Sequence, residues 1–459
     1  MKKSWLRWLL VIGSLVCGLA LAGCAGRPRV TPTAIPTPTA TPAPPTATPV
    51  PTATPEPTAT PTPTPPVLGA PGPTSWACPA DGRKITVWHD WAGDVFAAVE
   101  RVFAHYMAVC PDSAVELVYK PDMNDALTAA VPASQAPDIF VWTSDHIGWL
   151  AEAGNIVPLD GRIDAAAFAA AYMPTAVDAV TYDGQLYGYP ASVESLVMLY
   201  NKDLIDEAEL PRTTDDLLSL AREWRKSDYL FVYSAKNDAY FSAPWWQAAG
   251  VTVVDEAGVS TFQGEGGYAA GHFIEALRAV MPEEIDYDIA DALFRGGFAA
   301  LTVNGPWYLG DLDAVGMNYG LALLPVFSPT GRPAMPFVSA RTLMLAKNAA
   351  RRGAAEAALD VMQYFTSPEA QVYLAQVAAL APTSRAALAH PNMQGLPVPA
   401  LLAAQAANGR PLPSTPYMAA LWEPMALGVE CIWTGGGTVE ECVDRMQALA
   451  EKYVREIRW

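Results

Sequence analysis

The distribution of proline constrains this chain most, because it separates a part that can fold from a part that cannot. Residues 27–66 consist almost wholly of Pro, Thr and Ala in repeated TPTATP-like phrases. Such a segment cannot bury a core, so we expect a disordered tether with polyproline II character. At about 3.1 Å per residue it would reach on the order of 120 Å when extended. The folded part must follow it, and it is long enough for one large domain or two medium ones.

The residues before the tether have the layout of a secretory signal. A basic start precedes an apolar run, Trp8–Leu21, which is typical of a signal peptide. The run ends in Leu21-Ala22-Gly23-Cys24, which resembles a bacterial lipobox. We therefore expect residues 1–23 to be a lipoprotein signal peptide and Cys24 to carry the lipid. The alternative is an uncleaved membrane helix, for which the run is short. Both interpretations place the remainder outside the cytoplasmic membrane and attached to it.

Charge and histidine content exclude several function classes. The formal net charge is −18, whereas proteins that grip nucleic acid need basic patches. The five histidines are far apart in the sequence, so we expect no metal site and no other cofactor. The chain also has no P-loop, no GxGxxG fingerprint and no nucleophile elbow, so nucleotide chemistry and nucleophilic hydrolysis have no support.

Cysteine usage agrees with an oxidising location. Apart from two cysteines within the first 24 residues, the chain has Cys78, Cys110, Cys431 and Cys442, which can pair in three ways. Cys78 precedes a predicted strand and Cys110 ends the helix that follows it, so both reach the same edge. Cys431 and Cys442 flank a glycine turn between two helical stretches. We favour disulfides within each of these pairs. A zinc site built from all four thiolates is the alternative, although no CxxC pair is present.

From Trp76 onward, patterns typical of strands and helices alternate along the chain. Short β-rich runs occur at residues 84–88, 115–119, 138–142 and 300–303. An apolar helical face follows the first run, and Pro306 and Pro368 suit the first turns of further helices. The alternation predicts parallel or mixed sheets covered by helices on both faces, which is an α/β fold. Ligands of such sheets bind beyond the carboxyl ends of strands.

Several segments in order resemble the bacterial extracellular solute-binding proteins, family 1. They are KITVWHDW (84–91), PDIFVWTSD (137–145), LAEAG (150–154), YPASVE (189–194), LYNKDL (199–204), GFAALTVNGPW (297–307), YGLALLP (319–325) and PFV (336–338). The similarity runs from about residue 82 to the C-terminus. It is closest to the maltose/maltodextrin-binding proteins of ABC importers.

The resemblance implies a periplasmic-binding-protein-like fold, in which two α/β lobes close around a sugar like a hinged jaw. We expect a linker at 24–75 and a monomeric solute-binding domain at 76–459. One lobe would contain about 76–193 and 337–390, and the other about 194–336 and 391–459. Such a receptor performs no chemistry. It hands its oligosaccharide, here a maltose/maltodextrin-like α-glucan, to the membrane subunits of the importer.

A sugar site needs aromatic rings for the apolar C–H faces and carboxylates or amides for the hydroxyl groups. The resemblance assigns these roles to the aromatic residues Trp142, Tyr240, Phe241, Trp307 and Trp422 and to the carboxylates Asp125, Asp145, Glu194 and Asp238. Trp142, Asp145 and Trp307 also fall at the carboxyl ends of predicted strands.

The chain departs from the family in the polar part of the site. Where the family often has Asp-Lys after the first strand, this chain has His89-Asp90-Trp91, so we expect Asp90 or Trp91 to make that contact. His146 stands at the position of a basic residue, and Ala426 stands where maltose binders tend to have an arginine. The rings are kept while the polar groups differ. This favours a carbohydrate and leaves open which one binds.

Two other interpretations use the same residues. A surface glycoside hydrolase needs two carboxylates about 5–5.5 Å or about 6.5–9.5 Å apart, and Asp145 and Glu194 are candidates. No hydrolase motif supports it, so we expect no enzyme. A receptor for another sugar, a polyamine, a peptide or a metal is the second interpretation. The acidic charge suits a cation, but aromatic residues with scattered carboxylates favour a sugar.

Overall fold

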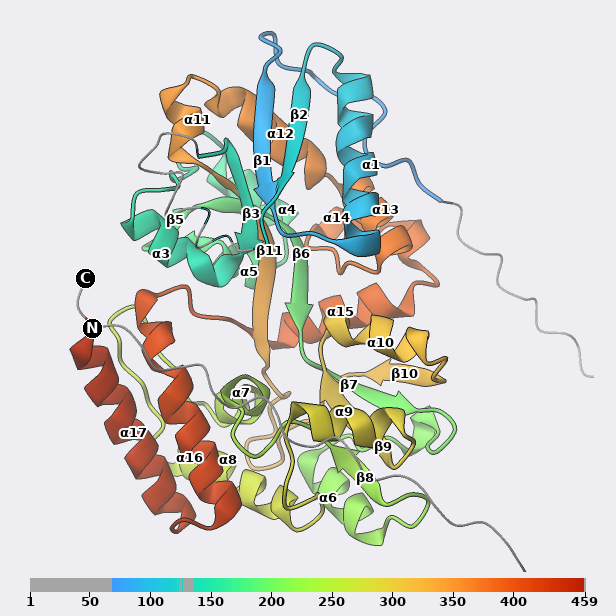
Figure 1. Cartoon of the computed structure of the whole chain (residues 1–459), viewed down its shortest axis with the longest axis vertical. Helices are drawn as coiled ribbons and strands as arrows, with labels where there is room; N and C mark the ends of the chain where they lie inside the picture. The colour runs from blue at the N-terminus through green and yellow to red at the C-terminus, as the bar shows by residue number, and fades with distance from the viewer. Residues whose placement is uncertain (1–67, 122, 124–125, 127–135, 458–459) are drawn as a thin grey trace, which may run out of the picture. The chain divides into compact units, whose positions relative to one another are not determined.

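A computed structural model describes residues 68–121, 123, 126 and 136–457. The predicted signal peptide and the lipid anchor at Cys24 lie outside the described residues and stay predictions, as does the part of the linker before residue 68. Residues Pro63–Trp459 form a compact unit of their own. Within the described residues, strands and helices alternate as the sequence predicts (Figure 1).

The first sheet is mixed, and it lies in the upper part of Figure 1. Its strands are β1 (Lys84–His89), β2 (Ala114–Tyr119), β3 (Ile139–Thr143), β6 (Gly188–Ser195), β11 (Phe337–Leu345) and β12 (Arg410–Pro411). Parallel pairing joins β1 to β2 and β3, whereas β11 runs antiparallel to β3 and β6. We call this sheet with its helices lobe one. A short hairpin of β4 (Thr181–Tyr182) and β5 (Gln185–Leu186) lies beside it.

The second sheet has the strand order β10-β7-β9-β8 and defines lobe two. Its strands are β7 (Val197–Asn201), β8 (Tyr229–Val232), β9 (Ala299–Asn304) and β10 (Tyr319–Ala322). β8 and β9 are parallel, and the other pairs are antiparallel. The chain passes from lobe one to lobe two at Leu196, between β6 and β7. This sheet is also mixed, so the predicted α/β class is confirmed.

Helices cover both sheets (Figure 1). Those of lobe one are α1 (Gly93–Val109), α3 (Ile147–Glu152), α4 (Ala165–Ala171), α5 (Pro174–Ala179), α11 (Lys347–Arg351), α12 (Ala355–Phe365), α13 (Pro368–Ala378) and α14 (Arg385–Leu388). Those of lobe two are α6 (Thr214–Glu223), α7 (Ala239–Ala248), α8 (Glu265–Arg278), α9 (Tyr287–Arg295), α10 (Leu309–Ala314), α16 (Trp422–Thr434) and α17 (Val439–Glu456). α15 (Pro397–Asn408) contacts β6 of lobe one and β10 of lobe two.

Short 3₁₀ turns connect several of these elements. They are η1 (Ser144–His146), η2 (Glu207–Glu209), η3 (Pro306–Tyr308), η4 (Pro391–Met393) and η5 (Pro416–Ala420). Pro306 occupies the first turn of η3, and Ser367 caps α13 with Pro368 in its first turn. Both helix starts are those that the sequence predicts.

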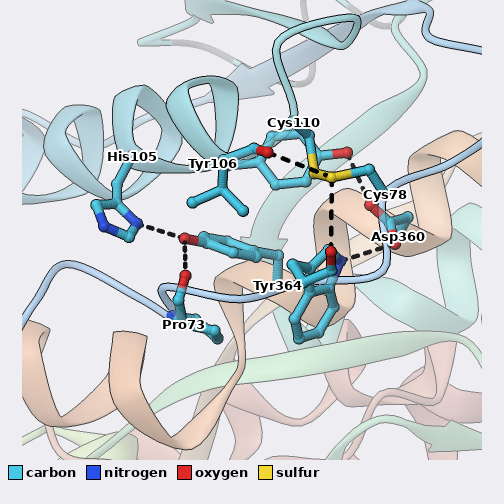
Figure 2. Close-up of a disulfide and its surroundings, with 9 residues drawn as sticks. Pro73, Cys78, His105, Tyr106, Cys110, Asp360 and Tyr364 are labelled. Atoms are coloured by element: carbon cyan, nitrogen blue, oxygen red, sulfur yellow. Dashed lines mark hydrogen bonds between the residues drawn. A yellow bond between two sulfur atoms is a disulfide. The ribbon is translucent and has the colours of Figure 1, made fainter.

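Residues 69–78, which precede β1 and which we call the base segment, are attached to lobe one (Figure 2). A disulfide joins Cys78 to Cys110 at the end of α1. The Trp76 indole donates a hydrogen bond to Asp360 at 2.9 Å, and the Tyr364 hydroxyl donates to the Pro73 carbonyl at 2.9 Å. A second disulfide, Cys431–Cys442, joins α16 to α17. In this structure each of these four cysteines therefore pairs with the partner that the sequence favours.

No helix among the described residues has the length and apolar character needed to cross a bilayer. Within the same residues, no three His, Cys, Asp or Glu side chains are grouped as a metal site would require.

Candidate ligand-binding site

The ends of β1, β6 and β9 meet at a cavity of about 580 Å³ between the lobes, which we call the first cavity. Lobe one contributes Asp90, Trp91 and Glu194, and lobe two contributes Trp307 from η3. These four residues are among those that the sequence assigns to the site. The cavity therefore lies where the topology places ligands, beyond strand ends and between the two lobes.

Trp307 is the exposed aromatic ring of this cavity. Its side chain is 46% exposed, although a tryptophan of a folded domain usually gains by burial. The ring lies against its own backbone turn, because a Cβ at Gly305 would come within 2.1 Å of it. Trp91 differs, since it is only 6% exposed and packs against Phe365 with ring centroids 5.3 Å apart. Much of the Trp307 ring is thus open to solvent at the cavity, whereas Trp91 is largely buried.

An arginine that the sequence analysis did not assign completes the polar part of the cavity. Arg341 of β11 donates from Nη1 to both carboxylate oxygens of Asp90 at 2.9 Å. Its Nη2 lies 3.8 Å from Glu194 Oε1. The side chains are between 17% and 28% exposed, so the three charges are fixed but still reachable. The missing lysine after the first strand is therefore replaced by a cation from a different strand.

The sequence contains a signal for Arg341. β11 reads FVSARTLML, and Arg341 is the one charged residue in that strand. A charge in a strand that is otherwise buried needs a partner. The register places Arg341 opposite Ser192 of β6, two residues from Glu194. Only the sheet pairing identifies that neighbour, and it cannot be deduced from the local pattern.

A row of aromatic rings from both lobes extends from the cavity. Tyr240 of α7 lies 6.3 Å from Trp307 and 5.9 Å from Phe337, measured between ring centroids. Phe337 lies 6.1 Å from Trp422 at the start of α16. Phe337 is fully buried and holds the row together, whereas Tyr240 and Trp422 are partly buried. The structure thus brings together three of the predicted aromatic residues, Trp307, Tyr240 and Trp422. Phe337, which the sequence analysis did not assign, packs between Tyr240 and Trp422.

Negative charge converges on Tyr240. Burial raises its pKa well above the ordinary value, and the carboxylates of Glu194, Asp145 and Asp238 raise it further. The hydroxyl therefore stays protonated. Two of these carboxylates, Glu194 and Asp145, belong to lobe one, and Asp238 belongs to lobe two. A neutral ligand rich in hydroxyl groups suits such a position, because it can donate to each carboxylate.

Trp142, Asp145 and His146 form a separate group at the end of β3. The His146 ring stacks on Trp142 with centroids 3.6 Å apart, and its Nδ1 lies 3.4 Å from Asp145 Oδ1. Burial opposes the charge of Asp145. Interactions with His146 and Thr143 outweigh it, so the pKa of Asp145 lies below its ordinary value. Asp145 is therefore ionised, and Trp142, only 9% exposed, is covered by the imidazole.

Three predicted residues have other environments or no description. Asp238 caps α7, accepting hydrogen bonds from the Tyr240 and Phe241 backbone amides at 2.9 and 3.1 Å. Phe241 is buried and packs against Tyr287. Asp125 lies outside the described residues. Neither Asp238 nor Phe241 lines the first cavity.

The family model for the bacterial extracellular solute-binding protein matches residues 91–372. Since the match spans more than half of the chain, this protein belongs to that family of solute-binding proteins. The family is a transport family without enzymatic activity, which agrees with the expectation that the chain is no enzyme.

Curated relatives include sugar-binding proteins. A maltotriose-binding protein of Pyrococcus abyssi is 29% identical over 82% of each chain. A galactooligosaccharide-binding protein of Bacillus subtilis is 22% identical over 82% of this chain and 90% of its own. A maltooligosaccharide ABC transporter solute-binding lipoprotein of Streptococcus pneumoniae is 23% identical over 65% of this chain and 72% of its own.

A solved structure shares the fold. A cyclo/maltodextrin-binding protein in complex with maltotetraose superposes with a TM-score of 0.75 at 24% identity, over 83% of this chain and all of that one. The likeness confirms the predicted two-lobe α/β architecture.

Proposed function

We propose that this protein binds maltooligosaccharides between its lobes and delivers them to the membrane subunits of an ABC importer. The observation that carries the proposal is the first cavity, where an exposed indole faces the Asp90–Arg341–Glu194 group. An aromatic face beside fixed polar groups is what a sugar ring requires. The names of the relatives from Pyrococcus and Streptococcus support an α-glucan, and the Bacillus relative supports testing a galactooligosaccharide beside it.

The coupling would be mechanical. A sugar held by both lobes favours the closed form by its differential affinity for the two conformations. The importer would then recognise the closed receptor. No covalent step on the sugar is needed, and a monomer suffices because both walls of the cavity come from one chain.

Tryptophan fluorescence of the compact unit, Pro63–Trp459, tests the proposal during titration with maltotriose. We expect a saturable change at micromolar sugar. Trp307→Ala and Trp422→Ala should each weaken binding about tenfold or more because a stacking surface is lost. Phe298→Ala is the matched control, since Phe298 is 51% exposed and lies outside the cavity. If the tryptophan variants unfold instead of binding weakly, both rings belong to the core.

We further propose that residues 1–23 are removed as a signal peptide and that Cys24 carries a lipid. Residues 24–75 would then form the linker before the solute-binding domain at 76–459, with the end of the linker, from Gly69 onward, held on lobe one. The lipobox-like sequence supports this, as does the name of the Streptococcus relative. Cys24→Ser should release the protein from the membrane fraction. Retention of that variant in the membrane would favour an uncleaved helix.

A further inference from the structure

The turn that carries Trp307 is held by buried residues on both sides. Asn304, the last residue of β9, is buried, and its side chain accepts a hydrogen bond from the Gly305 amide at 2.9 Å. Tyr308, the last residue of η3, is also buried, and its amide donates to the Gly305 carbonyl at 3.1 Å. Between them, the ring of Pro306 fixes its own φ. The backbone of this turn therefore has little freedom to move.

Gly305 lies against the indole of Trp307. A Cβ at Gly305 would come within 2.1 Å of Cη2 and Cζ3 of Trp307 and within 2.5 Å of Cε3. These are three consecutive atoms of the six-membered ring of the indole, and a Cβ in a folded protein stays at least 3.0 Å from such neighbours. The ring thus occupies the space that a side chain at position 305 would fill.

The backbone conformation of Gly305 does not itself require glycine. Its φ is −100° and its ψ is 178°, which is extended backbone that other residues adopt without strain. An alanine variant would also keep both of the backbone hydrogen bonds of this residue. The missing side chain therefore matters for the Trp307 ring and not for the turn.

The other surroundings of the ring leave it open toward the first cavity. Tyr240 lies 6.3 Å away between ring centroids, and the two ring planes are tilted by 56°, so these rings do not stack. Contact with the Gly305 backbone favours one position of an indole that is otherwise exposed. A ring that is already in place when a sugar arrives loses less conformational entropy on binding.

We propose that Gly305 is a positioning residue of the sugar site, because its missing side chain lets the Trp307 ring lie against the turn at the edge of the first cavity. The inference rests on the proposed function and deepens it, since it names the residue that sets the position of the exposed indole. Gly305→Ala should displace the ring while the turn and the fold stay in place.

The indole N–H resonances in a nitrogen–proton correlation NMR spectrum of the compact unit test the position of the ring without any sugar. The spectrum of Trp307→Ala identifies the Trp307 resonance by its loss. In Gly305→Ala we expect this resonance to shift, whereas those of the buried Trp245 and Trp433 should stay in place. The urea midpoint of Gly305→Ala should stay close to that of the wild type. An unchanged Trp307 resonance would overturn the proposal. A large fall in the midpoint would do so too, since the turn and not the ring would then have yielded.

Calorimetric titration with maltotriose tests the consequence for binding. We expect Gly305→Ala to raise the Kd about tenfold, because the stacking surface is displaced. The double variant Gly305→Ala/Trp307→Ala should bind within about twofold of Trp307→Ala alone, since the ring that the new Cβ displaces is already absent. Gly436→Ala is the matched control and should bind as the wild type does. Gly436 lies outside the first cavity, and a Cβ there would meet its nearest neighbours at an ordinary 3.5 Å.

The outcomes separate the role of Gly305 from the proposed function. Wild-type affinity in Gly305→Ala would overturn the positioning role and leave the proposed function intact. An equal further loss when Gly305→Ala is added to Trp307→Ala would overturn it as well, because the glycine would then act on something other than the ring. If the wild type binds no maltotriose, the proposed function fails and the role of Gly305 in sugar binding fails with it.

Discussion

At the scale of single residues, Arg341 is the central charge of the first cavity. Arg341→Gln removes the partner of two partly buried carboxylates, so we expect the free energy of unfolding to fall by about 1–2 kcal/mol. Sugar affinity should fall too, because Asp90 and Glu194 lose their fixed positions. Urea unfolding and calorimetry measure the two effects. Arg341→Lys keeps the charge but loses the bidentate hydrogen-bond geometry. Its unfolding free energy and sugar affinity should therefore lie between those of the wild type and those of Arg341→Gln. Wild-type stability and affinity in Arg341→Gln would contradict this role.

His89, by contrast, serves the core. It is 1% exposed and stacks on Phe96 with ring centroids 5.0 Å apart. Burial lowers its pKa, although Asp90 and the Trp91 backbone oppose the shift. Below about pH 6.5 the unfolded chain therefore takes up a proton that the folded protein resists, and stability falls as the pH falls.

His89→Phe should keep the stack and remove this pH dependence. Between pH 7.5 and 5.5, the wild type should lose more unfolding free energy than the variant, by at most about 1.4 kcal/mol. Urea unfolding at the two pH values measures the difference. Equal losses in both proteins would show that His89 is not kept neutral by its surroundings.

The candidate site could be predicted only in part from single residues. Trp307 and Glu194 lie within recognisable motifs, GFAALTVNGPW and YPASVE, so the sequence predicts their positions in the site. Arg341 pairs with Asp90, which is 251 positions away in the chain. A local sequence pattern cannot predict a contact between residues so far apart. Asp238 shows the opposite limit, because a carboxylate at a helix start suits a cap and a ligand equally well.

At the scale of elements, variants of Asp238 can separate its role as the cap of α7 from a role in ligand binding. Asp238→Ala removes the side chain that caps α7, and we expect a loss of about 1 kcal/mol in unfolding free energy. Asp238→Ser restores a capping oxygen without the charge. If Asp238 is a cap alone, the serine variant should recover both stability and sugar affinity. If Asp238→Ser recovers the unfolding free energy but calorimetric titration shows that sugar affinity stays low, Asp238 also binds the ligand.

Most elements follow from local physics. Alternating and continuous apolar runs form β1, β3 and β9, and Pro306 and Ser367 begin helical turns as their residue types dictate. The role of β11 does not follow in this way. It pairs with β3, β6 and β12, and these partners come from three distant parts of the chain, so its central position depends on tertiary packing.

At the scale of the whole molecule, two disulfides tie the chain at different separations. Cys78–Cys110 closes 32 positions and holds the base segment on lobe one, whereas Cys431–Cys442 closes 11. Loop-closure entropy predicts a loss of about 3–4 kcal/mol when the first is removed, and a smaller loss for the second. Paired Cys→Ser variants in urea unfolding test the order. A larger loss for Cys431–Cys442 would show that local packing outweighs chain entropy.

The central claim is that a maltooligosaccharide binds between the two lobes. A crystal structure of the compact unit with maltotriose tests it most directly. We predict a sugar ring stacked on Trp307, with hydroxyl groups within hydrogen-bond distance of Asp90, Glu194 or Arg341. Maltotriose bound elsewhere, with the first cavity occupied only by water at saturating sugar, would contradict the account.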